Sequence, residues 1–246
     1  MCKGLTLKGI SINLFSGKIK QSWLRICPDA ITHVQIHDPV AALTFDDGPH
    51  PVYTPMLLRV LEEHDVHATF FMLGELAKKY PEIVRMVAGA GHIIGNHSWG
   101  HHNLTQVRSR FDRLRRIAAC ARVTAPYGKR LFRPPYGAYN NQMRLDALIL
   151  RYKIILWSVS AQDWRPQSSE EIAQKITDRI IPGSIFLLHD AISDGKSLND
   201  PRDRSTMLDG LEIALPILKE RINFVTVPEL LKRGKAGKNW PRYSEQ

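Results

Sequence analysis

Hydrophobic and polar residues follow one another along the chain in a repeating order that predicts short strands separated by helices. From Val40 onward, short apolar runs bounded by polar residues, Gly or Pro are typical of buried strands. The expected strands are residues 40–45, 68–73, 92–97, 131–133, 153–159, 184–188 and 223–227. The expected helices are residues 54–64 with a Thr54 cap, 75–88 interrupted at Pro81, 105–122, 141–151, 169–180, 207–221 and a short helix from Pro228.

This alternation favours parallel strands joined by crossover helices. Roughly seven strands and seven helices fit a distorted (β/α) barrel in one α/β domain, with an open doubly wound sheet as the alternative. A chain of 246 residues with 43% apolar residues is long enough for one large core. We interpret residues 1–39 as an N-terminal extension, 40–232 as the domain and 233–246 as a basic tail.

The formal net charge of +10 favours anionic partners, but much of this charge is local. One cluster falls on the expected helix 105–122 and comprises Arg108, Arg110, Arg113, Arg115, Arg116 and Arg122. We interpret it as a solvated helix face, with nucleic-acid binding as a remote alternative. Aromatic residues are not interleaved with these charges, and no nucleic-acid-binding module is recognisable, so no specific nucleic-acid partner is expected.

Targeting signals and cysteine chemistry are not indicated. The sequence has no apolar run of about 18 residues, which a transmembrane helix would need, and no evident signal peptide, so we expect a cytoplasmic protein. Three cysteines at wide spacing (Cys2, Cys27 and Cys120) indicate neither a disulfide framework nor a cysteine metal site.

Side chains capable of chemistry fall just after the expected strands. They are Asp46, Asp47, His97, Arg133, Asp163 and His189. In a barrel or a doubly wound sheet, functional groups gather at the carboxyl ends of the parallel strands. Taken alone, Asp-Asp-Gly is more often an ordinary turn. The repetition at several strand ends is what favours a functional site.

Two imidazoles, His97 and His101, stand at positions i and i+4 and can chelate one metal ion. Ser98 follows the first histidine where a metalloprotease motif would have Glu, so a base must come from elsewhere. Asp46 and Asp47 supply a base and a third ligand. Adjacent strand residues point to opposite faces, although a local twist at the strand end could bring both carboxylates into one pocket. Three ligands with an open position are typical of a catalytic metal site.

Five ordered motifs of the chain resemble those of the polysaccharide deacetylases, carbohydrate esterases of family four. They are Thr44-Phe45-Asp46-Asp47-Gly48-Pro49, His97-Ser98-x-x-His101, Arg133-Pro134-Pro135-Tyr136-Gly137, Asp163-Trp164 and Ile185-Phe186-Leu187-Leu188-His189-Asp190. The resemblance covers roughly residues 40 to 230 and implies that residues 40–232 form the catalytic domain.

The resemblance implies a role for each matched residue. Asp47, His97 and His101 would hold a divalent cation, zinc first, with Co²⁺ or Mn²⁺ as alternatives. Asp46 would be the general base, and His189 the general acid that protonates the leaving amine. An amide needs both, because an amine leaves poorly unless it is protonated.

The resemblance also implies the residues that support these groups. Arg133 would orient the base, and the backbone N–H of Tyr136 would stabilise the oxyanion. Leu187 and Trp164 would line the pocket for the acetyl methyl group, and Asp163 would tune the catalytic side chains.

One position departs from the family pattern. Three residues before Asp163 the family often has a further acid, whereas this chain has Ser160. We interpret His50, Trp99 and His102, which lie beside the motifs, as loop or packing residues.

The residues and the resemblance lead to one function and two alternatives. The function is metal-dependent removal of N-acetyl groups from an amino-sugar glycan of the chitin-oligomer or peptidoglycan type. The first alternative is a deacylase or deformylase of a small or lipid-linked amide. The second is a glycan-binding relative without enzymatic activity, which the presence of base, ligands and acid disfavours.

Overall fold

The computed structural model describes residues 29–193 and 202–238. The expected N-terminal extension up to residue 28 and the tail from residue 239 lie outside this range, as do Cys2 and Cys27. The remaining cysteine, Cys120, is buried and has a free thiol.

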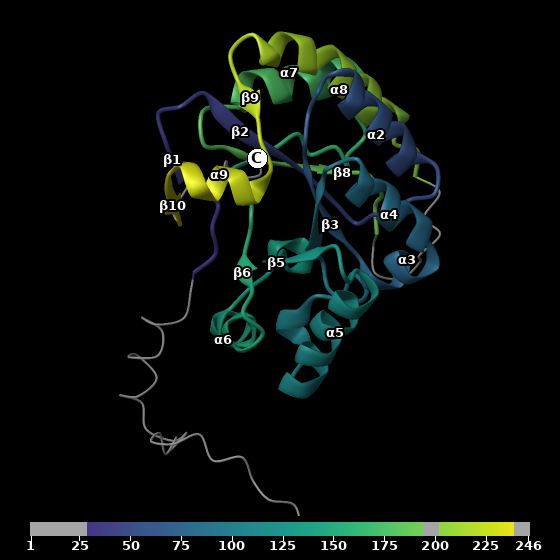
Figure 1. The fold of residues 1–246 in the computed structure, drawn as a ribbon, viewed down its shortest axis with the longest axis vertical. Coiled ribbons are helices and arrows are strands. Elements are labelled where there is room, and N and C mark those ends of the chain that lie inside the picture. The colour runs from purple at the N-terminus through teal and green to yellow at the C-terminus, as the bar shows by residue number, and fades with distance from the viewer. Residues whose placement is uncertain (1–28, 194–201, 239–246) are drawn as a thin grey trace, which may run out of the picture.

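A parallel sheet that curls into a half-barrel organises the fold, with strand order β6-β5-β4-β3-β2-β8-β7 and β9 paired to β2 (Figure 1). The strands are β2 (Val40–Asp46), β3 (Thr69–Met72), β4 (Ile93–Asn96), β5 (Gly128–Phe132), β6 (Lys153–Ile154), β7 (Val159–Ser160), β8 (Ile185–His189) and β9 (Asn223–Phe224). Every pairing within the sheet is parallel, which confirms the expected α/β architecture of about seven parallel strands.

Helices cover the outer face of the curled sheet, as the ring of coils around the strands in Figure 1 shows. They are α2 (Tyr53–Glu63), α3 (Gly74–Lys79), α4 (Pro81–Gly89), α5 (Arg110–Val123), α6 (Asn141–Ile149), α7 (Ser169–Arg179), α8 (Ser205–Lys219) and α9 (Val227–Arg233). Pro81 divides α3 from α4, as expected, because proline cannot continue a helix but is favoured at its first turn.

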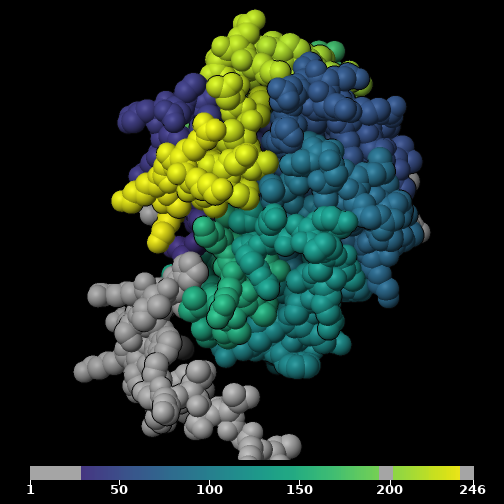
Figure 2. Space-filling view, viewed as in Figure 1, coloured from purple at the N-terminus to yellow at the C-terminus, as the bar shows by residue number. Residues whose placement is uncertain are grey.

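The alternation along β2 decides which side chains face the inside of the half-barrel. Leu43 and Phe45 belong to the outer core beneath the helices. Ala42 belongs to an inner core together with Val227 and Leu230 of α9, which therefore closes the end of the half-barrel where the strands begin. Figure 2 shows this C-terminal segment (yellow) on the surface, next to the first described residues of the chain (purple). By the same period of two, Asp46 faces inward at the opposite, open end.

The single strand expected at residues 153–159 was wrong. This segment forms two short strands, β6 and β7, which lie at opposite edges of the sheet. The residues between them run from one edge of the sheet to the other. On the way, Leu156 N donates to Ile31 O at 2.8 Å and Ser158 N donates to Ile185 O at 3.0 Å. The single segment thus bridges both edges and gives the barrel its distortion.

Two expected helix starts were also wrong. The helix expected at 105 begins at Arg110, after a short 3₁₀ turn, because the Ser109 hydroxyl caps it by accepting from Asp112 N. Thr54 lies inside α2 rather than capping it, and its hydroxyl donates to the buried Asp190.

The arginine-rich helix α5 is not a uniformly solvated face, which corrects that interpretation. Arg113 is only 1% exposed, and its Nε donates to the buried Asp146 carboxylate at 2.6 Å. This ion pair joins α5 to α6.

Parts of the expected extension and tail pack together on the domain. A separate antiparallel pair is formed by β1 (His33–Gln35) and β10 (Lys235–Gly237). Among the residues that the structure describes, no helix has the length and apolar character needed to cross a membrane.

Candidate active site

The candidate site lies at the open end of the half-barrel, where sharp turns follow the strands. Four residues just beyond strands have left-handed backbone conformations, with φ of 72° at Asp47, 72° at Ser98, 60° at Tyr136 and 55° at Gln162. A residue with a side chain adopts this conformation only where its surroundings hold it, and such residues cluster at functional sites. The turns direct side chains from different strands towards one another.

Both adjacent aspartates face one pocket because of the turn at Asp47. Asp47 Oδ1 lies 3.2 Å from His97 Nε2, and Asp46 Oδ2 lies 3.9 Å from the same nitrogen. A continued strand would have pointed the two carboxylates to opposite faces. The local twist that the sequence left open is therefore present.

The structure brings Asp47, His97 and His101 together as a buried group whose ligand atoms all lie within 4.8 Å of one another. The Asp47 Oδ1 to His101 Nε2 distance is 3.3 Å. The other carboxylate oxygen, Asp47 Oδ2, accepts from Ser193 N at 2.8 Å and is thereby held in place.

Hydrogen bonding fixes the proton of His97 and leaves a site that suits a cation. His97 Nδ1 lies 2.7 Å from Arg133 O, an atom that can only accept, so Nδ1 carries the proton and Nε2 presents a lone pair. That lone pair faces Asp47 Oδ1, a buried oxygen without a hydrogen-bond partner among the described residues. Two acceptors pointed at each other are stabilised by a metal ion between them, and orientation of a ligating imidazole by a carbonyl is usual in metal sites.

The pKa values of the other two residues of this group, Asp47 and His101, suit metal binding. Burial would raise the pKa of Asp47, but the close approach of the imidazoles of His97, His101 and His189 holds it below its ordinary value. Burial lowers the pKa of His101 to about 4, with only partial opposition from Asp47. Near neutral pH the site therefore offers one carboxylate and a neutral imidazole at His101, the ligand forms that a metal needs.

Arg133, which is fully buried, fixes Asp46. Its Nη1 donates to Asp46 Oδ1 at 2.7 Å and to Thr44 Oγ1 at 2.8 Å, while Nε and Nη2 donate to the carbonyls of Ile155 and Leu156. The guanidinium, which also lies over an aromatic ring of β3, joins three parts of the half-barrel. Asp46 Oδ2 is left facing the group formed by Asp47, His97 and His101, which we call the ligand group.

His189 and Asp46 stand opposite each other in the register of β8 and β2. Asp163 holds His189 twice, with its Oδ1 2.9 Å from the ring Nδ1 and its Oδ2 accepting from the backbone N at 2.9 Å. Burial would lower the pKa of His189, but the charge and hydrogen bond of Asp163, and the charges of Asp47 and Asp46, raise it above its ordinary value. The imidazole therefore keeps a proton to a higher pH than usual, with Nε2 free to donate it.

Arg204 was missed by the sequence analysis. It precedes α8 and is 4% exposed, and its guanidinium pairs with Asp163 Oδ2 and donates to the carbonyls of Asp163 and His189. Burial would raise the pKa of Asp163, but His189 and Arg204 hold it below its ordinary value. Nothing local in the sequence marks an arginine some forty positions away as the partner of Asp163.

The expected wall residues border these groups. The Trp164 ring stands edge-on to His189 at 5.3 Å, and the Tyr136 ring lies 4.3 Å from His101. Leu187, two residues before His189 on β8, points to the same side of the strand and is buried. Ser160, at the position that departs from the family pattern, accepts from Gln162 N at 3.0 Å and so shapes the turn before Asp163.

Asp190 is a further buried acid of this region, and its sequence context did not indicate a role for it. Burial raises its pKa to about 7, and the charges of Asp47 and Asp46 act in the same direction, while the Thr54 hydroxyl opposes the shift by donating to it. Its carboxylate packs against Gly48, where an added Cβ would lie 2.2 Å from Asp190 Oδ2. The absence of a side chain at Gly48 is therefore required for the turn after Asp47.

Comparisons with known proteins identify deacetylases that are similar to this chain. The family model described as polysaccharide deacetylase matches residues 33–155. A peptidoglycan-N-acetylglucosamine deacetylase of Bacillus cereus is 37% identical over 200 residues, which are 80% of this chain and 70% of that protein. A chitooligosaccharide deacetylase of Azorhizobium caulinodans is 38% identical over 190 residues, covering 73% of this chain and 88% of that protein.

A solved structure is similar over most of the chain. It is the crystal structure of a peptidoglycan N-acetylglucosamine deacetylase in complex with 4-naphthalen-1-yl-N-oxidanyl-benzamide. The TM-score is 0.75 with 33% sequence identity, and the match covers 89% of this chain and 99% of that one.

Proposed function

Because the chain belongs to the polysaccharide deacetylase family, we propose that it removes N-acetyl groups from an amino-sugar glycan of the chitin-oligomer or peptidoglycan type, in a metal-dependent hydrolysis. The relatives act on one or the other of these glycans according to their names. The substrate is thus an N-acetylated sugar chain, and the bond that breaks is the amide C–N bond.

Asp47, His97 and His101 would hold the divalent cation. Two nitrogen donors and one oxygen donor suit Zn²⁺, with Co²⁺ and Mn²⁺ as alternatives, and leave room for a further ligand. When bound, the cation supplies Lewis-acid polarisation and lowers the pKa of water.

Asp46 takes the proton of the attacking water. Arg133 holds its Oδ1 at 2.7 Å, which leaves Oδ2 as the basic atom directed at the ligand group. A carboxylate fixed in this way does not have to rotate during the reaction, and its position beside the ligands places it within reach of the water proton.

His189 donates the proton that the leaving amine needs. Asp163 accepts from Nδ1, so the opposite nitrogen, Nε2, is the donor towards the substrate. The raised pKa of His189 extends to higher pH the range over which this acid is protonated. Base and acid approach the amide from β2 and β8, which are neighbouring strands.

The remaining residues bind and orient the substrate. The backbone N–H of Tyr136, in the left-handed turn after β5, is the donor for the oxyanion that forms when the amide carbonyl is attacked. Leu187 and Trp164 exclude water around the acetyl methyl group. The observation that carries the proposal is the pair of facing acceptors, His97 Nε2 and Asp47 Oδ1, beside the Asp46–Arg133 and His189–Asp163 pairs.

Acetate release by the purified chain tests the proposal. We expect acetate from chitin oligomers or peptidoglycan fragments, loss of activity with a chelator, and recovery on adding Zn²⁺ or Co²⁺. Asp46→Asn should lower kcat by about a hundredfold or more, because general base catalysis contributes that much. Asp38→Asn, which changes an exposed aspartate, is the matched control.

Two results would contradict the proposal. With metal bound, no acetate from any N-acetylated glycan would exclude this substrate class, and turnover of small formamides or lipid-linked amides instead would identify the alternative. Full activity of Asp46→Asn would exclude the assigned base.

A further inference from the structure

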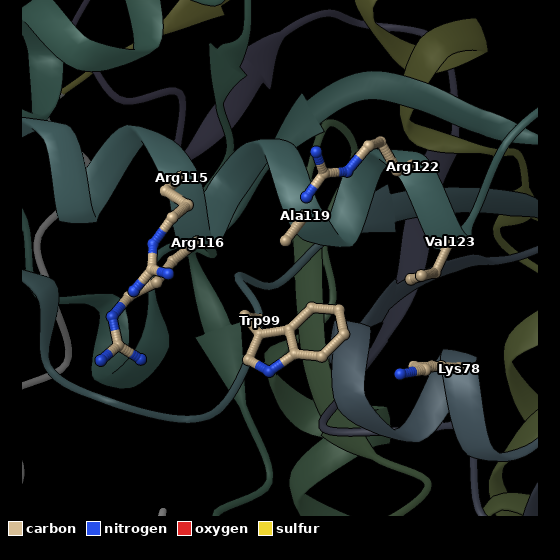
Figure 3. Close-up of a pocket in the computed structure, with 7 residues that line it drawn as sticks. All are labelled: Lys78, Trp99, Arg115, Arg116, Ala119, Arg122 and Val123. Carbon is tan, nitrogen blue, oxygen red and sulfur yellow. The ribbon is translucent and has the colours of Figure 1, made fainter.

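A basic hollow lies between α3 and α5, beside the loop that carries the two metal-binding histidines. Its volume is about 500 Å³, within the range of ligand-binding pockets. Figure 3 shows the indole of Trp99 in the hollow, with Arg115, Arg116 and Arg122 on α5 and Lys78 on α3 around it. We call this group of residues the basic hollow.

Four cationic side chains line the basic hollow, and none of its lining residues is acidic. Arg115 has a loose ion pair with Asp112 at 3.7 Å, in which both side chains are largely exposed. Such a pair contributes little. Arg116 Nη1 lies 3.4 Å from His102 Nδ1, while its buried Nε has no hydrogen-bond partner among the described residues. The hollow thus has more positive charge than its surroundings neutralise.

The spacing on α5 concentrates this charge on one helix face. Arg115, Ala119 and Arg122 follow one another at steps of four and three residues, so they share a face. Arg116 lines the same hollow, and Figure 3 shows the small Ala119 between it and Arg122. Like charges on one face repel each other, and an anion between them removes that repulsion.

Trp99 gives the hollow a flat, rigid wall. It is half-buried, and a Cβ built on Gly74 would lie 2.8 Å from its ring and 2.9 Å from Cys120 Cα. Gly74 thus allows the indole to pack between α3 and α5. A fixed indole suits the C–H face of a sugar ring, because aromatic side chains bury large apolar surfaces in defined geometry.

The basic hollow and the metal-ligand group share one loop. Trp99 lies midway between His97 and His101, and backbone hydrogen bonds from Gly74 N to Ser98 O and from Glu75 N to Trp99 O, both 2.9 Å, fix that loop to α3. Arg116 Nη1 also lies 3.4 Å from Nδ1 of His102, the residue directly after His101, so the hollow borders the loop on which the two histidines stand.

We propose that the basic hollow binds a carboxylate carried by the glycan, on a sugar unit next to the one that is deacetylated. The inference rests on the proposed function and refines its substrate class from N-acetylated glycans in general to acidic ones. The guanidinium groups of Arg116 and Arg122 bind the carboxylate, since arginine offers paired donors to such groups. Trp99 packs against the sugar ring that bears it.

Three substrates that differ in charge provide the test. They are a neutral chitin oligomer, a peptidoglycan fragment with its muramyl and peptide carboxylates, and the same fragment with its carboxylates amidated. The double variant Arg116→Gln, Arg122→Gln should raise KM for the acidic fragment by about tenfold or more, as expected for loss of charge-assisted hydrogen bonds. The kcat of the variant for the acidic fragment should stay as in the wild type. Its kcat and KM for the chitin oligomer and for the amidated fragment should also be unchanged.

A matched control removes the same charge elsewhere. Arg59→Gln with Arg85→Gln changes two exposed arginines of α2 and α4, outside the basic hollow. The control should keep the wild-type KM for every substrate. The wild-type preference for the acidic fragment should also weaken as salt is raised, because salt screens exposed charges.

Several outcomes would overturn the inference. It fails if the Arg116, Arg122 variant changes KM for all three substrates equally, or for none of them. If a glycerol phosphate oligomer competes for the hollow and binds there more tightly than the acidic fragment, the hollow is a phosphate site. Retention on DNA that only this variant loses, with unchanged glycan kinetics, would assign it to nucleic acid.

Failure of the proposed function itself is distinguishable. If the wild type with metal releases no acetate from any glycan, titration calorimetry of the acidic fragment and its amidated form decides the inference without turnover. Binding that needs both the carboxylates and the two arginines would support the hollow, and equal binding of the two forms would overturn it.

Discussion

Replacing Arg133 by lysine tests how the base is held. Arg133→Lys keeps the positive charge but exchanges a planar fork for a single ammonium. The fork donates to four acceptors on two parts of the half-barrel: Thr44 Oγ1 and Asp46 Oδ1 on β2, and the carbonyls of Ile155 and Leu156 after β6. A lysine nitrogen on a flexible stem cannot reproduce that arrangement.

The expected loss follows from these hydrogen bonds. If lysine keeps the contact with Asp46, three bonds are lost at about 1 kcal/mol each, or about 3 kcal/mol of the free energy of unfolding. For a domain of this size that lowers Tm by roughly 6–12 °C. Because Asp46 is then held less firmly, kcat/KM should also fall by about 10–100-fold, the usual effect of removing a residue that orients a reacting group.

Thermal unfolding and acetate release measure the two effects. Arg130→Lys, on the same strand but exposed, is the control, and it should keep both Tm and activity. A Tm for Arg133→Lys within about 2 °C of the wild type would refute the reasoning, since a 3 kcal/mol loss should exceed that shift. Unchanged kcat/KM despite a lowered Tm would instead confine Arg133 to a structural role.

Three further predictions concern the acid, the first turn and the metal ligands. Asp163→Asn removes the carboxylate that raises the pKa of His189; activity falls as rising pH deprotonates this acid, so the basic limb of the pH–kcat profile should move to lower pH, and an unmoved limb would contradict the assignment. Gly48→Ala should lower the free energy of unfolding by about 1–3 kcal/mol in chemical denaturation, because its Cβ would meet Asp190 at 2.2 Å; wild-type stability would show that the acid can move aside. His101→Ala should bind Zn²⁺ at least about 100-fold more weakly in a competition titration with a chelator, since loss of a ligand costs more than loss of its orienting partner, and wild-type affinity would remove His101 from the site.

Much of the fold was predictable because the signals are local. The apolar run of β2 and the carboxylates after it stand next to each other in the sequence, so both the strand and the chemistry at its end could be predicted. His97 and His189 could be placed in the same way, since each ends or follows an apolar run. Pro81 marked the break between α3 and α4 for the same local reason.

Other features were not predictable, because they depend on how distant segments pack. The run 153–159 has strand character throughout, but which neighbour each half pairs with depends on the curl of the whole sheet. Arg113 has the same sequence character as the exposed arginines of α5, and only its position opposite Asp146 makes it a buried ion pair.

The sequence by itself determined the alternation of strands and helices, the strand ends at which chemistry would lie and the family of the chain. Only the tertiary structure decided that Asp47 turns to face His97 and that Arg204 binds the Asp163 carboxylate, which also holds His189. The hollow that the arginines of α5 share with Trp99 was likewise decided by the tertiary structure. The physical reason is the range of the interactions. Apolar periodicity and turn residues act over a few positions, whereas a left-handed turn, a buried ion pair or a hollow exists only when segments far apart in sequence meet.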